Sequence, residues 1–100
     1  NLKIIQHMAK LVHENGSKLV IVDSTKNLVR YGQLPSALGT KILEKFCEFN
    51  GIGYIPLHDQ LNKSRRKGIA THWKYDWHFN ETGQRIFFES MFNYFKNIKN

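Results

Sequence analysis

The chain has 100 residues, 41% of them hydrophobic and 23% charged, a balance typical of one compact folded domain and not of a disordered segment. Fifteen Lys and Arg residues against eight Asp and Glu residues give a formal charge of +7. The chain has a single cysteine, which excludes an internal disulfide and a metal site with several cysteines. No apolar run reaches the roughly 20 residues that a membrane-spanning helix needs, and no export signal opens the sequence. Because the first residue is Asn1 and not Met, we expect the native start to lie upstream, and the cellular compartment stays open.

The first quarter of the chain has the patterns of a helix followed by a strand. Apolar side chains recur at helical spacing over residues 2–15, which predicts an amphipathic helix. Asn15 and Gly16 supply the left-handed stop expected just beyond such a helix. Residues 18–23 form a continuous aliphatic and β-branched run without alternation, which is typical of a strand covered on both faces. We therefore expect an interior parallel strand here.

The middle of the chain repeats this order. Residues 24–34 are polar and predict a connection of undefined structure. A helix is expected over residues 34–50, because Pro35 suits a first helical turn and apolar side chains follow on one face. A short apolar run at residues 52–57 predicts the next parallel strand. Two strand patterns separated by a helix form a crossover unit, so the sequence indicates the α/β class.

The last third contains a predicted loop and a terminal helix. Residues 62–75 are basic and aromatic without clear periodicity, so we expect a loop. Asn80 can cap a final helix. The apolar face expected for that helix carries Phe87, Phe88, Met91, Phe92, Phe95 and Ile98. Two parallel strands do not make a self-sufficient sheet, so residues 1–100 are expected to be a single partial domain, completed by an upstream segment or by a second copy of the chain.

The clearest chemical signal lies just before the final helix. Asp76 and His78 are two positions apart, and in an extended segment the side chains at i and i+2 point the same way. A carboxylate beside imidazole Nδ1 fixes the tautomer, leaves Nε2 as a base and stabilises the imidazolium formed during proton transfer. Asn80 is expected to hold the histidine-bearing loop, and Gly83 to allow close packing of the backbone. The pattern predicts two members of a hydrolytic triad.

The segment Asp76-Trp77-His78-Phe-Asn80-Glu-Thr-Gly83 resembles the last motif block of the SGNH (GDSL-like) hydrolase family, in which an Asp and a His shortly before the terminal helix are often followed by Asn and Gly. The commonest form of that block has two residues between Asp and His, whereas only Trp77 stands between them here. The resemblance implies the C-terminal part of a flavodoxin-like three-layer α/β/α sandwich with parallel strands. It also implies hydrolysis or transfer of an acyl ester through a serine nucleophile, with His78 as general base, Asp76 as the orienting acid and no cofactor.

The family's Gly-Asp-Ser nucleophile block and its two oxyanion-hole blocks are not recognisable in these residues. Ser24 is the internal alternative, because it follows Asp23 at the end of the first expected strand and gives the chain order Ser, Asp, His. No Gly precedes Asp23, however, and no earlier strand pattern precedes this one, so a turn or cap serine is the simpler interpretation. We expect little activity from the chain alone, since oxyanion donors usually contribute most to catalysis of acyl transfer.

Aromatic residues beside the pair are candidates for substrate contact. Tyr75 and Trp77 offer flat faces of the kind that stack on bases or on sugar rings. The resemblance favours a sugar or an acyl group over nucleic acid, and it implies a small ester or an O-acylated carbohydrate as the substrate. Trp73 is assigned to ordinary packing. The acyl chain length, and the choice between hydrolysis and transfer, stay open.

Other interpretations of the polar residues remain. The basic run at residues 63–67 and the nearby aromatics could bind an anionic polymer in a non-catalytic domain, although a solvated surface is simpler and nucleic acid is not expected. His72, Asp76 and His78 could ligate zinc, but no fourth ligand accompanies them, and we expect no metal. A degenerate homologue with a structural or oligomeric role is the third possibility.

Overall fold

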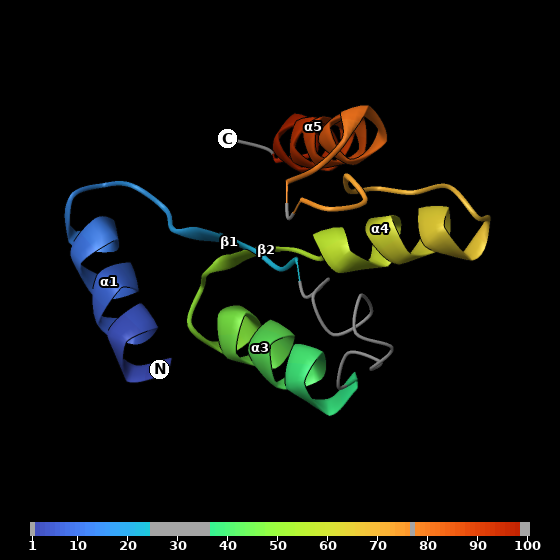
Figure 1. The fold of residues 1–100 in the computed structure, drawn as a ribbon. Helices are drawn as coiled ribbons and strands as arrows, with labels where there is room; N and C mark the ends of the chain where they lie inside the picture. Colours follow the sequence, from blue (N-terminus) through green and yellow to red (C-terminus); the bar gives the residue numbers. More distant parts are fainter. Residues whose placement is uncertain (1, 25–36, 77, 99–100) are drawn as a thin grey trace.

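The computed structural model describes residues 2–24, 37–76 and 78–98 (Figure 1). The elements in chain order are α1 (Leu2–Glu14), β1 (Val20–Val22), α3 (Ala37–Phe49), β2 (Gly53–Ile55), α4 (Leu57–Arg66) and α5 (Glu81–Lys96). The two strands pair in parallel, and helices lie on both sides of them: α5 on one side, α1 and α3 on the other (Figure 1). The expected α/β class is confirmed.

The pairing of the strands is short. Residues 20–22 lie opposite residues 53–55, and beyond them the Asp23 N–H donates to the Ile55 carbonyl at 2.9 Å. The side chains of β1 are half-buried, whereas an interior strand was expected from the apolar run. In the part of the chain that the structure describes, β1 pairs with one strand, β2, and its other edge has no neighbouring strand. This open edge explains why β1 is less buried than an interior strand.

The core lies between the sheet and the pair α1 and α3. Ala9, Cys47 and Ile52 are its buried members. Half-buried apolar side chains surround them: Ile5, Leu19, Ile21, Leu43, Phe46 and Tyr54. The predicted ends of the two helices are confirmed, because Gly16 and Gly51 have φ of 78° and 67°, a left-handed conformation that glycine adopts without steric cost.

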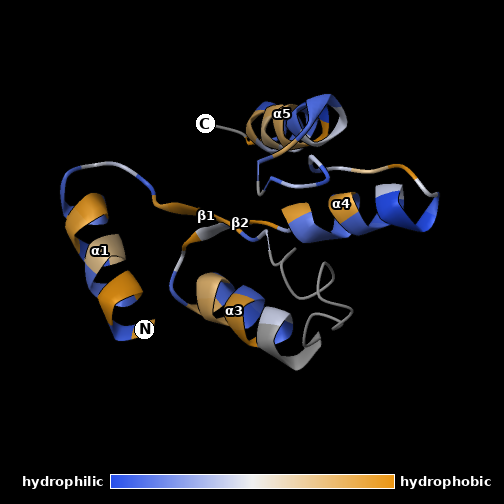
Figure 2. Ribbon diagram, in the orientation of Figure 1, coloured by the Kyte–Doolittle hydropathy of each residue, from blue (hydrophilic) through white to orange (hydrophobic). Residues whose placement is uncertain are grey.

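Helix α4 corrects the loop expected at residues 62–75. Its ten residues begin directly after Pro56 and extend to Arg66, so the basic run lies in the last turns of a helix. Only Leu57, His58 and Leu61 are buried, and the later turns are hydrophilic (Figure 2). Two leucines four residues apart are too few to produce a visible apolar period, which is why the sequence pattern missed this helix.

Helix α5 begins after Asn80 as expected, but much of its predicted apolar face is exposed. Phe88 is 65% exposed, and Phe92 and Phe95 are also exposed. Gly83 is the one residue of α5 that is buried. Among the described residues, no helix combines the length and the apolar character needed to cross a bilayer.

Candidate active site

Between α4 and α5 the structure describes residues 67–76 and 78–80, which lie side by side at their two ends. His72 and Phe79 face each other in an isolated antiparallel bridge, and the Trp73 N–H donates to the His78 carbonyl at 3.2 Å. The chain between them turns at residues 74–76. This hairpin-like loop holds Asp76 at its tip and returns the backbone beside it at His78.

Asp76 and His78 meet as the spacing predicted. His78 Nδ1 lies 2.5 Å from Asp76 Oδ1, and the His78 backbone N–H donates to the same oxygen at 3.0 Å. Two contacts to one carboxylate oxygen fix both the ring and the backbone that carries it. With a proton on Nδ1, the Nε2 lone pair is left as an acceptor.

The pair is open to solvent. The His78 side chain is 86% exposed and that of Asp76 is 52% exposed. Residues 2–24, 37–76 and 79–98 offer no hydrogen-bond partner to His78 Nε2. Within these ranges His78 contacts Asp76 and Trp73, and Ser24 does not reach it. The arrangement can therefore take a proton from a group that approaches from outside the described residues.

Asn80 ties the base of the loop to α5. Its Oδ1 accepts the Gly83 N–H at 2.9 Å, its Nδ2 donates to the Ala70 carbonyl at 3.0 Å, and its own N–H donates to the Thr71 carbonyl at 3.0 Å. The expected N-cap is confirmed. Gly83 is also buried as expected, because a Cβ there would overlap the Thr71 carbonyl oxygen.

A side-chain cluster under the loop, formed by Arg65, Thr71 and His72, was missed from the sequence. Arg65 Nε donates to Thr71 Oγ1 at 3.2 Å, and Arg65 Nη2 lies 3.1 Å from His72 Nδ1. Burial lowers the pKa of the Arg65 guanidinium, which nevertheless stays cationic because arginine starts far above neutral pH. Nothing in the basic run distinguished Arg65 from the exposed Arg66 beside it.

The candidate substrate aromatics lie at the tip of the loop. Tyr75 is 88% exposed, with Lys74 Nζ 5.3 Å from its ring centroid, and Trp73 is also exposed instead of packed as expected. Trp77 lies outside the described residues. Exposed rings next to Asp76 are available for contact with a ligand.

A second polar cluster lies at the carboxyl ends of the strands. Tyr54 Oη donates to the buried Asp23 Oδ2 at 2.6 Å, and His58 Nδ1 lies 3.6 Å from the same oxygen. Asp59 Oδ1 is 3.2 Å from His58 Nε2. Burial first, and then the hydrogen bond to Asp23, raise the pKa of Tyr54 above its usual range. These contacts join β1, β2 and α4 where parallel sheets commonly place ligands.

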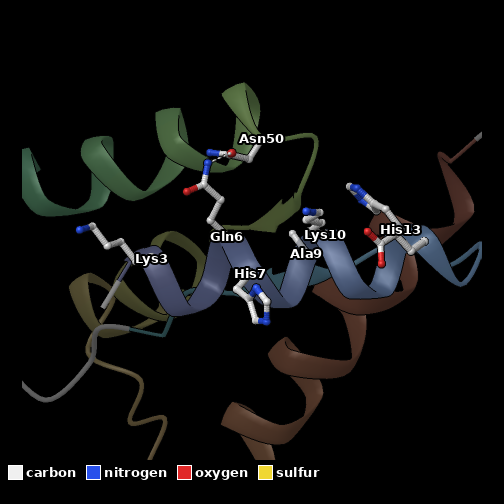
Figure 3. Close-up of a pocket in the computed structure, with 8 residues that line it drawn as sticks. Lys3, Gln6, His7, Ala9, Lys10, His13 and Asn50 are labelled. Carbon is white, nitrogen blue, oxygen red and sulfur yellow. Dashed lines mark hydrogen bonds between the residues drawn. The ribbon is translucent and has the colours of Figure 1, made fainter.

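Metal ligands and surface grooves are two further features that bear on the Asp76 and His78 pair in the part of the chain that the structure describes. Within the described ranges, no three His, Cys, Asp or Glu side chains come together as metal ligands. The groove in Figure 3 lies elsewhere, between α1 and the end of α3, where Gln6 Nε2 donates to Asn50 Oδ1 at 3.1 Å. It is lined by cations and polar groups of α1, including Lys3, Lys10 and His13.

Comparisons with protein families, with curated proteins and with solved structures gave no match for this chain. The resemblance to SGNH hydrolases therefore stays a prediction that rests on the motif and on the geometry of the loop that carries it.

Proposed function

We propose that Asp76 and His78 are the acid and base of an SGNH-type serine esterase or acyltransferase. The observation that carries the proposal is the 2.5 Å contact between His78 Nδ1 and Asp76 Oδ1, combined with an exposed Nε2. This is the orientation in which a carboxylate supports an imidazole that removes a proton from an alcohol. The Asn80 cap and the close contact at Gly83 support it by fixing the loop on α5.

In the proposed reaction, His78 Nε2 removes the proton of a serine hydroxyl while the serine oxygen attacks the ester carbonyl. Asp76 stabilises the imidazolium that results. The imidazolium then gives its proton to the leaving alcohol, and the acyl-serine remains. Water, or an acceptor alcohol in the case of transfer, then gives a proton to His78 Nε2 as its oxygen attacks the acyl-serine. The imidazolium returns that proton to the serine oxygen, which leaves the acyl group and regenerates the serine. The serine and the oxyanion donors are contributed from outside the described residues.

The same proposal includes a larger flavodoxin-like three-layer sandwich, completed by strands from a further segment or from a second copy. It is supported by the half-buried β1 and by the many apolar side chains that the described residues leave exposed. These side chains are Leu2, Ile4, Met8, Leu11, Ile42, Phe49, Phe88, Phe92 and Phe95. Sedimentation velocity of the 100-residue chain is expected to show self-association, and a stable monomer at high concentration would contradict this part of the proposal.

The proposed substrate is a small ester or an O-acylated carbohydrate. Tyr75 and Trp73 support this choice, because exposed aromatic rings beside the base provide flat apolar faces for a sugar ring. Trp77, between Asp76 and His78 in the sequence, is proposed to contribute in the same way.

The test is hydrolysis of a chromogenic acetate ester by the intact protein. His78→Ala is expected to lower kcat by about 10²- to 10⁴-fold, the range typical of a lost general base. The matched control is His7→Ala, which removes an exposed histidine of α1 and is expected to leave kcat unchanged. Far-UV circular dichroism checks folding. Unchanged turnover in the His78 variant would refute the role of this side chain.

One observation favours a second function, binding of an anionic polymer. Lys63, Arg66 and Lys67 are exposed at the end of α4, and Lys74 is exposed in the loop that follows. Binding of a sulfated polysaccharide that weakens steeply with salt, and that is lost when Lys63, Arg66 and Lys67 are neutralised together, would favour this function over the esterase. Salt-independent or absent binding would exclude it.

A further inference from the structure

We infer that Arg65 is a positioning residue that acts through Thr71 and His72 to hold the loop bearing Asp76 and His78 in its reactive geometry. The expected effect on kcat rests on the proposed function. Its structural content, an anchor formed by Arg65, Thr71 and His72, can be tested without any substrate.

The anchor joins helix α4 to the beginning of the loop through two side chains. Arg65 Nε donates to Thr71 Oγ1 at 3.2 Å, and Arg65 Nη2 contacts His72 Nδ1 at 3.1 Å. Thr71 is 1% exposed, and its Oγ1 also lies 2.9 Å from His72 Nδ1. The two nitrogens of one guanidinium thus contact two consecutive residues, which a lysine ammonium does not reproduce in the same geometry.

The contact with Arg65 indicates the tautomer of the neutral His72 ring. A guanidinium has only donors, so His72 Nδ1 must be the acceptor of the Arg65 contact. The neutral ring therefore carries its proton on Nε2. His72 consequently has the opposite tautomer to the one that the Asp76 contact imposes on His78.

The anchor reaches the catalytic pair through a short series of contacts. The His72 ring packs on Phe79 with 4.7 Å between the centroids, and these two residues form the bridge that closes the loop. Immediately beyond His72, the Trp73 N–H donates to the His78 carbonyl. Displacement of His72 would therefore move the backbone of His78, and with it the imidazole.

Loss of the anchor is expected to lower kcat more than it changes KM, because the loop positions the base. A displacement of about 1 Å in a catalytic group lowers rates by up to about 10²-fold. We expect Arg65→Met to lower kcat for the chromogenic acetate by tens to about a hundredfold, with KM nearly unchanged.

The matched control is Arg66→Met, which removes the same charge from the same helical turn. Arg66 is exposed and takes no part in the anchor contacts, so its variant is expected to keep the kcat of the parent protein. Amide hydrogen exchange supplies a readout independent of activity. The Trp73 and Asn80 amides, which donate to His78 and Thr71, are expected to exchange about tenfold or more faster in Arg65→Met and at the parental rate in Arg66→Met.

A second pair of variants keeps the test decisive if Arg65→Met does not fold. Thr71→Ser retains the hydroxyl and is expected to retain kcat and slow exchange, whereas Thr71→Val removes the hydroxyl and is expected to resemble the Arg65 variant. Long-range ¹H–¹⁵N spectra of the parent protein are expected to show His72 protonated on Nε2 and not on Nδ1.

The inference is overturned if the Arg65 and Arg66 variants share the same kcat and exchange rates, if Thr71→Val behaves like Thr71→Ser, or if His72 carries its neutral-state proton on Nδ1. If His78→Ala keeps full activity, the proposed function fails instead. The exchange rates and the His72 tautomer then still decide whether the anchor exists.

Discussion

Replacement of Gly83 by alanine tests the contact between α5 and the loop that carries the candidate pair. Gly83 is the third residue of α5 and is buried. An added Cβ would lie 2.9 Å from both Cβ and Cδ1 of Phe79, and it would overlap the backbone carbonyl oxygen of Thr71. Carbon atoms pack best at about 3.5–4.0 Å, so Phe79 alone must move by more than about half an ångström.

Two opposing effects decide the sign of the change in stability. Alanine is favoured over glycine in a helix by up to about 1 kcal/mol. Overpacking costs about 1–3 kcal/mol, and displacement of the Thr71 carbonyl weakens its hydrogen bond from Asn80, which is worth about 0.5–1.5 kcal/mol. The net expectation is a loss of about 0.5–3.5 kcal/mol.

Urea unfolding followed by circular dichroism measures this loss. Arg85→Ala is the control, because the Arg85 side chain is 65% exposed and makes a surface ion pair with Glu89, so its variant should change stability by less than about 0.5 kcal/mol. Gly83→Ala should also lower the proposed esterase activity, since the collision lies between α5 and the base of the loop. A Gly83→Ala protein as stable and as active as its parent would refute the close packing described here.

Three further predictions concern the Asn80 cap, the half-buried Tyr54 hydroxyl and the buried Cys47 thiol. Asn80→Ala should destabilise the chain by about 0.5–2 kcal/mol. Asn80→Asp should destabilise it by less, because aspartate keeps the acceptor for the Gly83 N–H. Equal losses of stability in urea unfolding would contradict the role of Asn80 as a cap. Burial, and secondly the hydrogen bond to Asp23, raise the pKa of Tyr54. The folded state therefore keeps a proton that the unfolded chain loses above about pH 10. As a result, the free energy of unfolding should fall as pH rises through that range. Tyr54→Phe should flatten this decline in urea titrations at alkaline pH, and an unchanged slope would contradict the assignment. Burial, and secondly the charge of Asp23, raise the pKa of Cys47, so a thiol reagent should react quickly only after denaturation; rapid labelling of the folded chain would contradict this.

Local patterns were sufficient to predict most of the elements and the candidate pair. The helix stops at Gly16 and Gly51 and the cap at Asn80 depend on a few neighbouring residues, and each is where the sequence indicated. Asp76 and His78 meet because both belong to one short loop. Contacts of this kind are set by spacing along the chain, which the sequence displays directly.

The features that the sequence did not reveal depend on partners distant along the chain or on weak periodicity. Tyr54 and Asp23 are 31 positions apart and meet only because β1 and β2 pair in register. Arg65 turns inward to Thr71 while Arg66 stays in solvent, a difference that two adjacent arginines do not show in a sequence. Helix α4 has too few buried side chains for a recognisable period.

The orientation of His78 is the central claim, and its tautomer in solution tests it most directly. Long-range ¹H–¹⁵N spectra should show the neutral ring protonated on Nδ1, facing Asp76, with Nε2 unprotonated. Asp76→Asn should abolish this preference, because an amide does not support the same tautomer. A neutral His78 that carries its proton on Nε2 in the parent protein, or a tautomer that is unaffected by Asp76→Asn, would contradict the account.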